Sequence, residues 1–376
     1  MRNFLKKLIN KFFRIFIVKE NKIVFESGRN LVDGNCKAVY DYMVEHNYDN
    51  YKLVWLVKKG TNVSGLRKKD YAYYKTFKAL YHLSTAKYWI RSQSIGSILD
   101  KRDNQVYIQL FHGNGVMKKM GYDVENVDIS DRKEADHVKE WDYYIANDSH
   151  DRDVIRSSTG YKGKIEVLGM AAVDNVIKHH KDKEFKRKVR NELGIVEVDK
   201  KIILYAPTFR DFDFDNDIID VPIESLSKLK DYIVVVRLHP LVREKINKKI
   251  FDYPNIVNGC NYPDCSDILA ITDVLISDYS SIIYEYMPLN LPIIFYPYDY
   301  DKYVSLRGGF SVDYLNELPG KIVYNEEELL DTIENIDKVT KEYKTKREKF
   351  TKKYNYLSDG KASERFVKKL EKGYFK

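Results

Sequence analysis

The sequence predicts an α/β protein built from two doubly wound, Rossmann-like domains that face each other across a cleft. A chain of 376 residues is too long for one compact core, so we expect two domains. Short apolar runs alternate with helical runs along most of the chain, which is typical of parallel sheets covered by helices. A charged helical stretch at 176–193 interrupts this alternation and marks the domain junction. We therefore assign residues 1–18 to an amphipathic helix, 19–175 to the first domain and 176–376 to the second.

The N-terminal segment carries apolar and basic side chains at helical spacing. The apolar set is Phe4, Leu5, Leu8, Ile9, Phe12, Phe13 and Phe16, and the basic set is Arg2, Lys6, Lys7, Lys11 and Arg14. This pattern favours a helix in the interface of an anionic membrane surface, where each basic residue contributes about 1 kcal/mol. The alternative is a helix packed on the first domain with its lysines in water. No apolar run reaches the roughly 18–20 residues that a membrane-spanning helix requires.

The first domain contains short apolar runs that we interpret as strands. They are Ile23–Glu26, Leu53–Val57, Tyr88–Ser92, Val106–Phe111, Tyr143–Ala146 and Ile165–Leu168. Helical runs such as 35–46 and 77–85 lie between them. Strands that alternate with helices in this way predict a parallel sheet, because parallel strands need helical crossovers.

The second domain repeats the alternation after the junction. Its candidate strands are Ile202–Tyr205, Ile233–Leu238, Asn255–Val257, Val274–Ser277 and Ile293–Tyr296. A long charged helix at about 326–354 and a terminal helix from Lys361 complete the predicted domain.

Composition limits the class of protein. Hydrophobic residues make up 44% of the chain and aromatic residues 14%, enough for packed cores, which excludes wholesale disorder. The formal net charge of +8 suits an anionic ligand or membrane surface and falls short of the dense basic patches of nucleic-acid-binding proteins. The three cysteines, Cys36, Cys260 and Cys265, lack CxxC spacing, so neither a disulfide framework nor structural zinc is predicted.

Acidic residues alternate after one of the strand-end turns, at Asp211, Asp213, Asp215 and Asp217. The run lacks the glycine and the terminal glutamate of a calcium-binding loop, so a solvated loop is the preferred interpretation. We therefore predict no metal site and no cofactor.

Two histidines, His112 and His239, each follow directly on a predicted buried strand. In open α/β sheets, ligands bind in the crevice beyond the carboxyl ends of the strands. Imidazole is well suited to move a proton or to hold a phosphate near neutral pH. We therefore predict one site, formed by both domains, for a phosphate-bearing substrate.

The residues around His112 favour catalysis over a structural role. Gly113 and Gly115 permit close backbone approach, and Lys118 and Lys119 follow. A histidine on such a turn is a candidate general base, and Lys118 is a candidate for stabilising negative charge. A structural histidine is the alternative.

Three further strand ends carry polar groups. The first lies between the strand 274–277 and a helical run at 282–287, and it contains Asp278, Ser280 and Ser281. The free N–H groups at the start of the helix and the serine hydroxyls would bind a phosphate. The alternative is a plain helix cap with no ligand bound. Arg237 and His239 are alternate residues and so share a face, as a diphosphate site requires. Thr208 and Arg210 occupy the third turn.

This ordered series resembles the CDP-glycerol glycerophosphotransferase family, the teichoic acid primases and polymerases of Gram-positive bacteria. The likeness spans about residues 20–370. Its blocks are His112-Gly113 with Lys118-Lys119-Met120-Gly121-Tyr122-Asp123, Ala206-Pro207-Thr208-Phe209-Arg210-Asp211, Arg237-Leu238-His239-Pro240, Ser277-Asp278-Tyr279-Ser280-Ser281, the run from Pro292 to Asp299, Arg307-Gly308, Leu318-Pro319-Gly320 and the run from Asp359 to Arg365.

The resemblance implies a GT-B-like fold and transfer of an alditol phosphate from CDP-glycerol or CDP-ribitol, with release of CMP. It implies a lipid-linked glycan acceptor at the cytoplasmic face of the cell membrane, in teichoic acid or capsule synthesis. It assigns the general base to His112 and the donor diphosphate to His239, Arg210, Ser280 and Ser281. Our full set of candidate residues is His112, His239 and Lys118 for catalysis, and Gly113, Asn114, Thr208, Arg210, Arg237, Asp278, Ser280, Ser281, Glu285, Asp299 and Arg307 for substrate binding.

One block departs from the family pattern. The family has His-Gly-Thr-Pro where this chain has His112-Gly113-Asn114-Gly115, which predicts a looser turn and leaves the acceptor open. The length of the chain fits a primase or a capsule-type transferase better than a long polymerase. The alternative function is a GT-B nucleotide-sugar glycosyltransferase of cell-surface polysaccharide synthesis.

Overall fold

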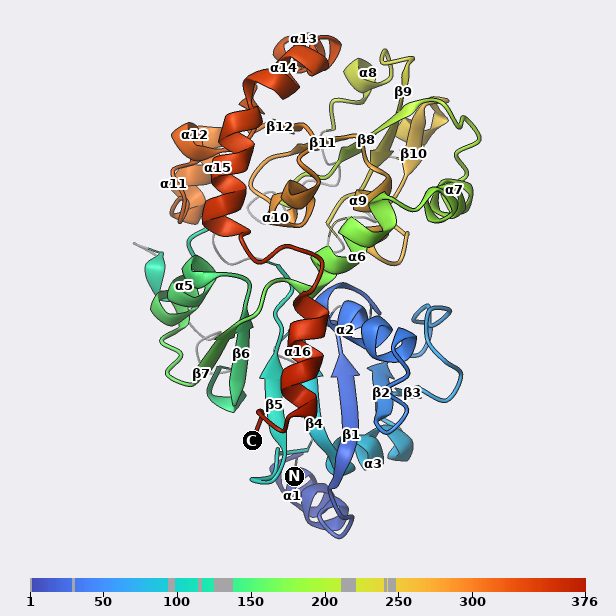
Figure 1. Cartoon of the computed structure of the whole chain (residues 1–376), viewed down its shortest axis with the longest axis vertical. Coiled ribbons are helices and arrows are strands. Elements are labelled where there is room, and N and C mark those ends of the chain that lie inside the picture. The colour runs from blue at the N-terminus through green and yellow to red at the C-terminus, as the bar shows by residue number, and fades with distance from the viewer. Residues whose placement is uncertain are drawn as a thin grey trace.

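The chain folds into two α/β domains, each built on a parallel sheet (Figure 1). The computed structural model describes residues 2–28, 31–93, 99–113, 117–124, 138–210, 221–239, 242 and 248–376. The first sheet has the strand order β3-β2-β1-β4-β5-β6-β7, and the second has the order β10-β9-β8-β11-β12-β13. In both sheets the order reverses next to the first strand, which is the switch point of a doubly wound fold. The predicted pair of α/β domains is confirmed.

The first sheet contains every strand predicted for it and one more. Its strands are β1 (Lys19–Glu26), β2 (Lys52–Val57), β3 (Tyr71–Tyr73), β4 (Ala86–Arg91), β5 (Val106–Gln109), β6 (Tyr143–Ala146) and β7 (Lys164–Val167). The additional strand, β3, has only three residues at the sheet edge and buries one of them, Ala72. The strand was not predicted because a strand this short and exposed has no apolar run in its sequence.

Helices cover both faces of the first sheet. On one face, α2 (Gly34–Glu45) and α16 (Ala362–Glu371) share an apolar cluster with β1 and β5. On the other face, α1 (Arg2–Phe13) and α3 (Phe77–Thr85) pack on residues such as Val24 and Trp89. The segments α5 (Ser149–Thr159), η2 (Gly121–Asp123) and η4 (Val138–Glu140) complete this domain.

The terminal helix α16 lies on the first domain, whereas we expected it with the second (Figure 1). Phe366, Val367 and Leu370 are buried in the cluster that contains Ile23 and Ile108. The sequence shows that α16 has an apolar face but gives no sign of which sheet covers it.

The second sheet also contains one strand beyond those predicted. Its strands are β8 (Lys201–Tyr205), β9 (Tyr232–Val236), β10 (Ile256–Asn258), β11 (Val274–Ser277), β12 (Ile293–Phe295) and β13 (Lys321–Ile322). Its helical segments are α7 (Lys183–Glu192), α8 (Ile223–Leu226), η7 (Lys248–Asp252), α9 (Cys265–Ile271), α10 (Ile282–Tyr286), η8 (Met287–Leu289), α11 (Tyr300–Arg307), α12 (Tyr314–Glu317), α13 (Glu326–Glu334), α14 (Ile336–Glu342) and α15 (Lys344–Tyr354). The single helix predicted at 326–354 is therefore three helices, because the chain turns at Asn335 and Tyr343.

The helix α6 (Ala171–His180) joins the two domains and lies between α2 and α9 (Figure 1). Its first residue, Ala171, belongs to the core of the first domain, and Val176 belongs to the core of the second. The predicted boundary at residue 176 therefore falls inside a helix that both domains share.

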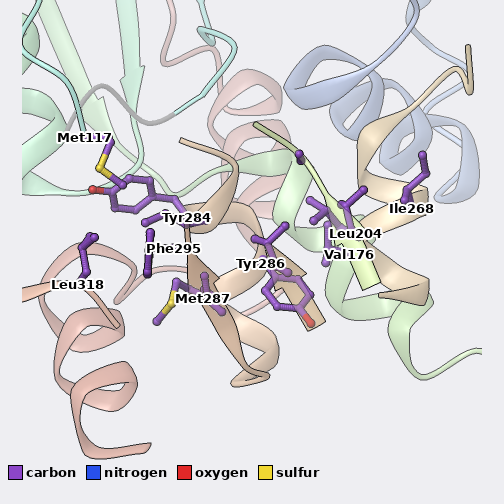
Figure 2. Packing of buried hydrophobic residues seen from close by; sticks show 14 of the residues in the cluster. Met117, Val176, Leu204, Ile268, Tyr284, Tyr286, Met287, Phe295 and Leu318 are labelled. Carbon is purple, nitrogen blue, oxygen red and sulfur yellow. The ribbon is translucent and has the colours of Figure 1, made fainter. Parts of the chain in front are cut away.

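A second connection follows β5. Met117 is buried in the core of the second domain, in one cluster with Tyr284 and Leu318 (Figure 2). The backbone of the same segment forms a bridge between Lys118 and Phe310, and the amide of Ser311 donates to the Met117 carbonyl at 3.1 Å. Met117 and Lys118 are thus fixed to the opposite domain. None of the described helices has the length and apolarity to cross a bilayer.

Candidate active site between the two sheets

A cavity of about 380 Å³ lies beyond the carboxyl ends of the strands of both sheets. His112 from the first domain and His239 from the second both line it. The structure brings many of the other predicted site residues to the same cavity. They are Gly113, Lys118, Thr208, Arg237, Ser280, Ser281 and Glu285.

His112 is oriented by a carbonyl group. Its Nδ1 lies 3.1 Å from the carbonyl oxygen of Ser92, the residue after β4. Because a carbonyl oxygen only accepts hydrogen bonds, Nδ1 carries the proton of the neutral ring and Nε2 does not. This tautomer makes Nε2 the basic nitrogen, as a general base requires.

Gly113, the residue after His112, closely approaches the opposite domain. A Cβ atom placed on Gly113 would lie 2.7 Å from Oγ of Ser281, the residue before α10. Real Cβ atoms essentially never come this close to another heavy atom. Position 113 therefore accommodates only glycine without a shift of the serine or of the turn.

We expect Gly113→Ala to lower turnover by roughly 10-fold, less than the ~10²-fold that a misplacement of about 1 Å can cost. The added methyl group displaces the Ser281 hydroxyl or moves the His112 turn. Steady-state kinetics of Gly113→Ala and of Gly113→Ala/Ser281→Ala measures the effect. The double variant is expected to regain part of the loss because the methyl group then faces a Cβ at 3.6 Å. Equal turnover in Gly113→Ala and the wild type contradicts this interpretation.

Thr208 provides a buried hydroxyl for a ligand. Its backbone N–H donates to Asp278 Oδ1 at 2.8 Å, which fixes the turn after β8. Its Oγ1 is buried at the cavity and has no hydrogen-bond partner among the described residues. Buried polar atoms are almost always paired, so this hydroxyl is suited to bind a substrate oxygen. Ser280 Oγ, in contrast, accepts from the Ile282 N–H at 3.3 Å, a bond between residues two positions apart at the start of α10, whose N-cap residue is Ser281.

A guanidinium and an imidazole of the second domain are held in place at the cavity wall. Arg237 Nη1 donates to the carbonyl oxygens of Gly259 and Tyr262 at 2.7 and 2.9 Å. The His239 ring stacks on Phe209, with ring centroids 4.4 Å apart. Arg237 and Lys118 therefore place two positive charges at a cavity wall where a diphosphate could bind them.

Arg210 does not line the cavity, although we predicted that it binds the donor. Its guanidinium pairs with Asp278 at 2.9 Å and with Asp299 at 2.7 Å, and its side chain is only 9% exposed. Burial lowers its pKa, but the two carboxylates outweigh that effect and raise the pKa above its usual value. The three charged groups stabilise the strand-end turns. Asp278, Asp299 and Arg307 are likewise absent from the residues that line the cavity, and Asn114 lies outside the described residues.

The prediction from sequence also missed cavity residues. Among them are Asp33, Asn35, Ser92, Asp264 and Cys265. Asp33 and Asn35 lie at the start of α2, directly after the first strand–turn unit, so the rule applied to the other strand ends would have found them. Ser92 directly follows β4, and Asp264 and Cys265 lie at the start of α9, which follows β10, so the same rule applies to them.

Glu285 is the carboxyl group of the cavity whose ionisation is most altered. Burial raises its pKa to about 8, with further contributions from Asp264 and Asp33 and an opposing one from Arg237. At neutral pH the side chain is therefore protonated and able to donate a hydrogen bond.

We expect the affinity for a diphosphate diester to fall above pH about 8, by up to about 10-fold per pH unit, because ionised Glu285 repels the diphosphate. Isothermal titration calorimetry across this pH range measures the effect, and the diphosphate diester does not itself titrate there. Glu285→Gln is expected to keep its affinity above pH 8, and an equal fall in the variant refutes the assignment to Glu285.

The sequence of the chain matches known proteins along almost its whole length. Residues 8–372 match the family CDP-Glycerol:Poly(glycerophosphate) glycerophosphotransferase. The chain belongs to this family. It is 32% identical to the teichoic acid glycerol-phosphate transferase of Staphylococcus aureus, over 99% of this chain and 100% of the relative. It is 30% identical to a teichoic acid poly(glycerol phosphate) polymerase of Bacillus spizizenii, over 98% of this chain and 97% of the relative.

Solved structures agree with this assignment. A variant of the wall teichoic acid polymerase TagF soaked with CDPG superposes with a TM-score of 0.88 at 28% identity, over 99% of this chain and 93% of that chain. A UDP-GlcNAc 2-epimerase of Neisseria meningitidis superposes with a TM-score of 0.53 at 12% identity, over 93% of this chain and 100% of that chain, which shows the fold alone. The family resemblance and the GT-B-like fold predicted from the sequence are both confirmed, and the chain is a transferase of this family.

Proposed function

We propose that the chain transfers glycerol phosphate, or another alditol phosphate, from a CDP-alditol to a hydroxyl of a lipid-linked glycan and releases CMP. The observation that carries this proposal is the convergence of His112, His239, Lys118 and Arg237 on one cavity between the two sheets. A base, a second imidazole and two cations around one cavity suit transfer of a phosphoryl group from a diphosphate. The printed names of the relatives, which make or extend glycerol-phosphate and ribitol-phosphate polymers, support the same reaction.

The proposed reaction begins at His112. Its Nε2 accepts the proton of the acceptor hydroxyl as that oxygen attacks the β-phosphorus of the donor. A bond forms between the acceptor oxygen and the β-phosphorus, and the bond from that phosphorus to the bridging oxygen breaks. The electron pair leaves on the bridging oxygen, so CMP departs, and the proton stays on His112.

The second domain stabilises the departing CMP. Arg237 and His239 face the cavity from the end of β9, and Lys118 reaches it from the segment that bridges the domains. The positive charges of Arg237 and Lys118 counter the charge that develops on the phosphate oxygens, and the His239 imidazole can donate a hydrogen bond to them. Thr208 supplies the unpaired hydroxyl described above.

Release of CMP tests the proposed function. The purified chain is incubated with CDP-glycerol or CDP-ribitol and a lipid-linked disaccharide, and CMP is measured by chromatography. Absence of CMP with every CDP-alditol, together with thermal stabilisation by a UDP-sugar, would favour the nucleotide-sugar glycosyltransferase instead.

We further propose that α1 binds an anionic membrane surface at the cytoplasmic face. Phe13, near its end, is 5% exposed and packs on the first domain, whereas Phe4, Leu5 and Leu8 are 68%, 57% and 49% exposed. The helix therefore has one apolar set on the protein and a second one exposed beside its lysines. This second set is what an interfacial helix inserts into lipid.

We expect Phe4→Ser/Leu5→Ser/Leu8→Ser to release the protein from vesicles that contain anionic lipid, because it removes the exposed apolar set and leaves Phe13 in place. Sedimentation with vesicles of phosphatidylcholine and phosphatidylglycerol measures binding. Val196→Ser/Val198→Ser is the control, because these residues are 82% and 70% exposed on the second domain. Equal binding by the triple variant and the wild type rules out α1 as the anchor.

A further inference from the structure

The backbone turns unusually just before His112. Phe111 has φ of 55°, a left-handed conformation that bulky residues rarely adopt and that costs free energy unless neighbouring groups hold it. Its ring lies against the His112 imidazole, with centroids 4.4 Å apart. The direction in which His112 leaves β5 therefore depends on this turn.

Asn35 binds the turn directly. Its Nδ2 donates to the carbonyl oxygens of Leu110 at 3.0 Å and of Phe111 at 3.2 Å. Successive carbonyls of an extended strand point in opposite directions, so both reach one amide only because Phe111 is not extended. The Asn35 side chain can thus bind both carbonyl groups in the left-handed turn, but it could not do so if the strand continued in extended conformation.

The same side chain also binds the helix that joins the domains. Asn35 Oδ1 accepts from the backbone N–H of Ala172 at 2.9 Å, in the first turn of α6. Asn35 is 5% exposed, and both N–H groups of its amide are used by the two carbonyls. It therefore connects the start of α2, the turn before His112 and the first turn of α6.

We propose that Asn35 is a positioning residue for the transfer reaction. It holds the turn at Phe111 so that His112 Nδ1 reaches the Ser92 carbonyl and Nε2 serves as the base, and it ties this turn to α6. It acts through His112, and its role in turnover rests on the proposed function. Two variants separate its bonds. Asn35→Ala removes all of them, whereas Asn35→Asp keeps an acceptor for the Ala172 N–H and places a carboxylate against two carbonyl oxygens.

The experiment compares kinetics and the state of the His112 ring. We expect both variants to lower kcat by roughly 10-fold while KM for CDP-glycerol stays within about 2-fold, because the base moves and the donor site does not. In ¹⁵N spectra of histidine-labelled protein, the wild-type His112 ring is expected to show the tautomer protonated at Nδ1. Both variants are expected to lose this single tautomer.

Asn255→Ala is the matched control. Asn255 is also 5% exposed, and its Nδ2 also donates to two carbonyl oxygens, those of Leu226 and Leu229, at the amino end of β10. It is expected to lower Tm like Asn35→Ala and to leave kcat and the His112 signal unchanged. The proposal is overturned if the folded Asn35 variants lose no more kcat than Asn255→Ala, or if their His112 signal matches the wild type. If the wild type releases no CMP, the proposed function fails, but the spectra still decide whether Asn35 positions His112.

Discussion

Replacement of His112 by alanine is expected to lower turnover by roughly 10²- to 10⁴-fold, the usual contribution of a general base. The ring is fixed by the Ser92 carbonyl with Nε2 as its basic nitrogen, and it lines the cavity that His239 also lines. Without it, the acceptor hydroxyl loses the imidazole that we propose takes its proton. The rate of CMP release at saturating CDP-glycerol measures the loss.

The affinity for CDP-glycerol is expected to change little in His112→Ala, because the cations and the Thr208 hydroxyl of the second domain remain. Calorimetric titration tests this point. His150→Ala is a suitable control, because this histidine is exposed and its ring contacts Tyr354 outside the cavity. If His112→Ala loses affinity and turnover by the same factor, His112 binds the donor and is not the base.

The strand ends explain why much of the site could be predicted from the sequence. In a parallel sheet, every residue that follows a strand lies at one edge. A buried strand followed by His112, by Arg237 and His239, or by Ser280 therefore places these groups at that edge whatever the details of packing. The same rule, applied to the first strand, would have added Asp33 and Asn35.

Other features depend on contacts between distant segments and are not visible in a local pattern. The assignment of α16 to the first domain depends on which apolar face is available, and Phe366 meets Ile23 only in the folded chain. The bridge between Lys118 and Phe310 joins segments from opposite domains. The role of Asn35 depends on a left-handed Phe111, which the composition of the turn does not indicate.

Arg210 follows the strand as predicted, but its ion pairs favour a role in the fold over the predicted contact with the donor. It follows a strand and carries a positive charge, so the sequence favoured a contact with the diphosphate. In the structure its charge is matched by Asp278 and Asp299, and the rings of Tyr279, Tyr298 and Tyr303 lie 4.9 to 5.4 Å from the guanidinium carbon. A cation in this environment has little positive charge left to offer a ligand.

We therefore expect Arg210→Met to lower the free energy of unfolding by about 3–5 kcal/mol, because it removes the cation that neutralises the two buried carboxylates. Urea unfolding monitored by circular dichroism measures the loss. Arg210→Met/Asp278→Asn/Asp299→Asn is expected to regain much of it, since removal of all three charges ends the repulsion. The amide oxygen that Asp278→Asn introduces can still accept from the backbone N–H of Thr208, so the turn after β8 keeps its hydrogen bond.

The control for this stability prediction is Arg187→Met, at an arginine that is 70% exposed and pairs with Glu184 at 3.7 Å. Exposed pairs of this kind contribute little, so its unfolding curve should match that of the wild type. The decisive comparison is between stability and CDP-glycerol affinity in Arg210→Met, measured well below the unfolding transition. If Arg210→Met has the unfolding free energy of the wild type but binds CDP-glycerol more weakly, Arg210 contacts the donor. If the variant is less stable but its folded form binds CDP-glycerol as the wild type does, the charge of Arg210 stabilises the fold. We expect the second result because Asp278 and Asp299 already pair with the guanidinium N–H groups that a diphosphate would have to bind.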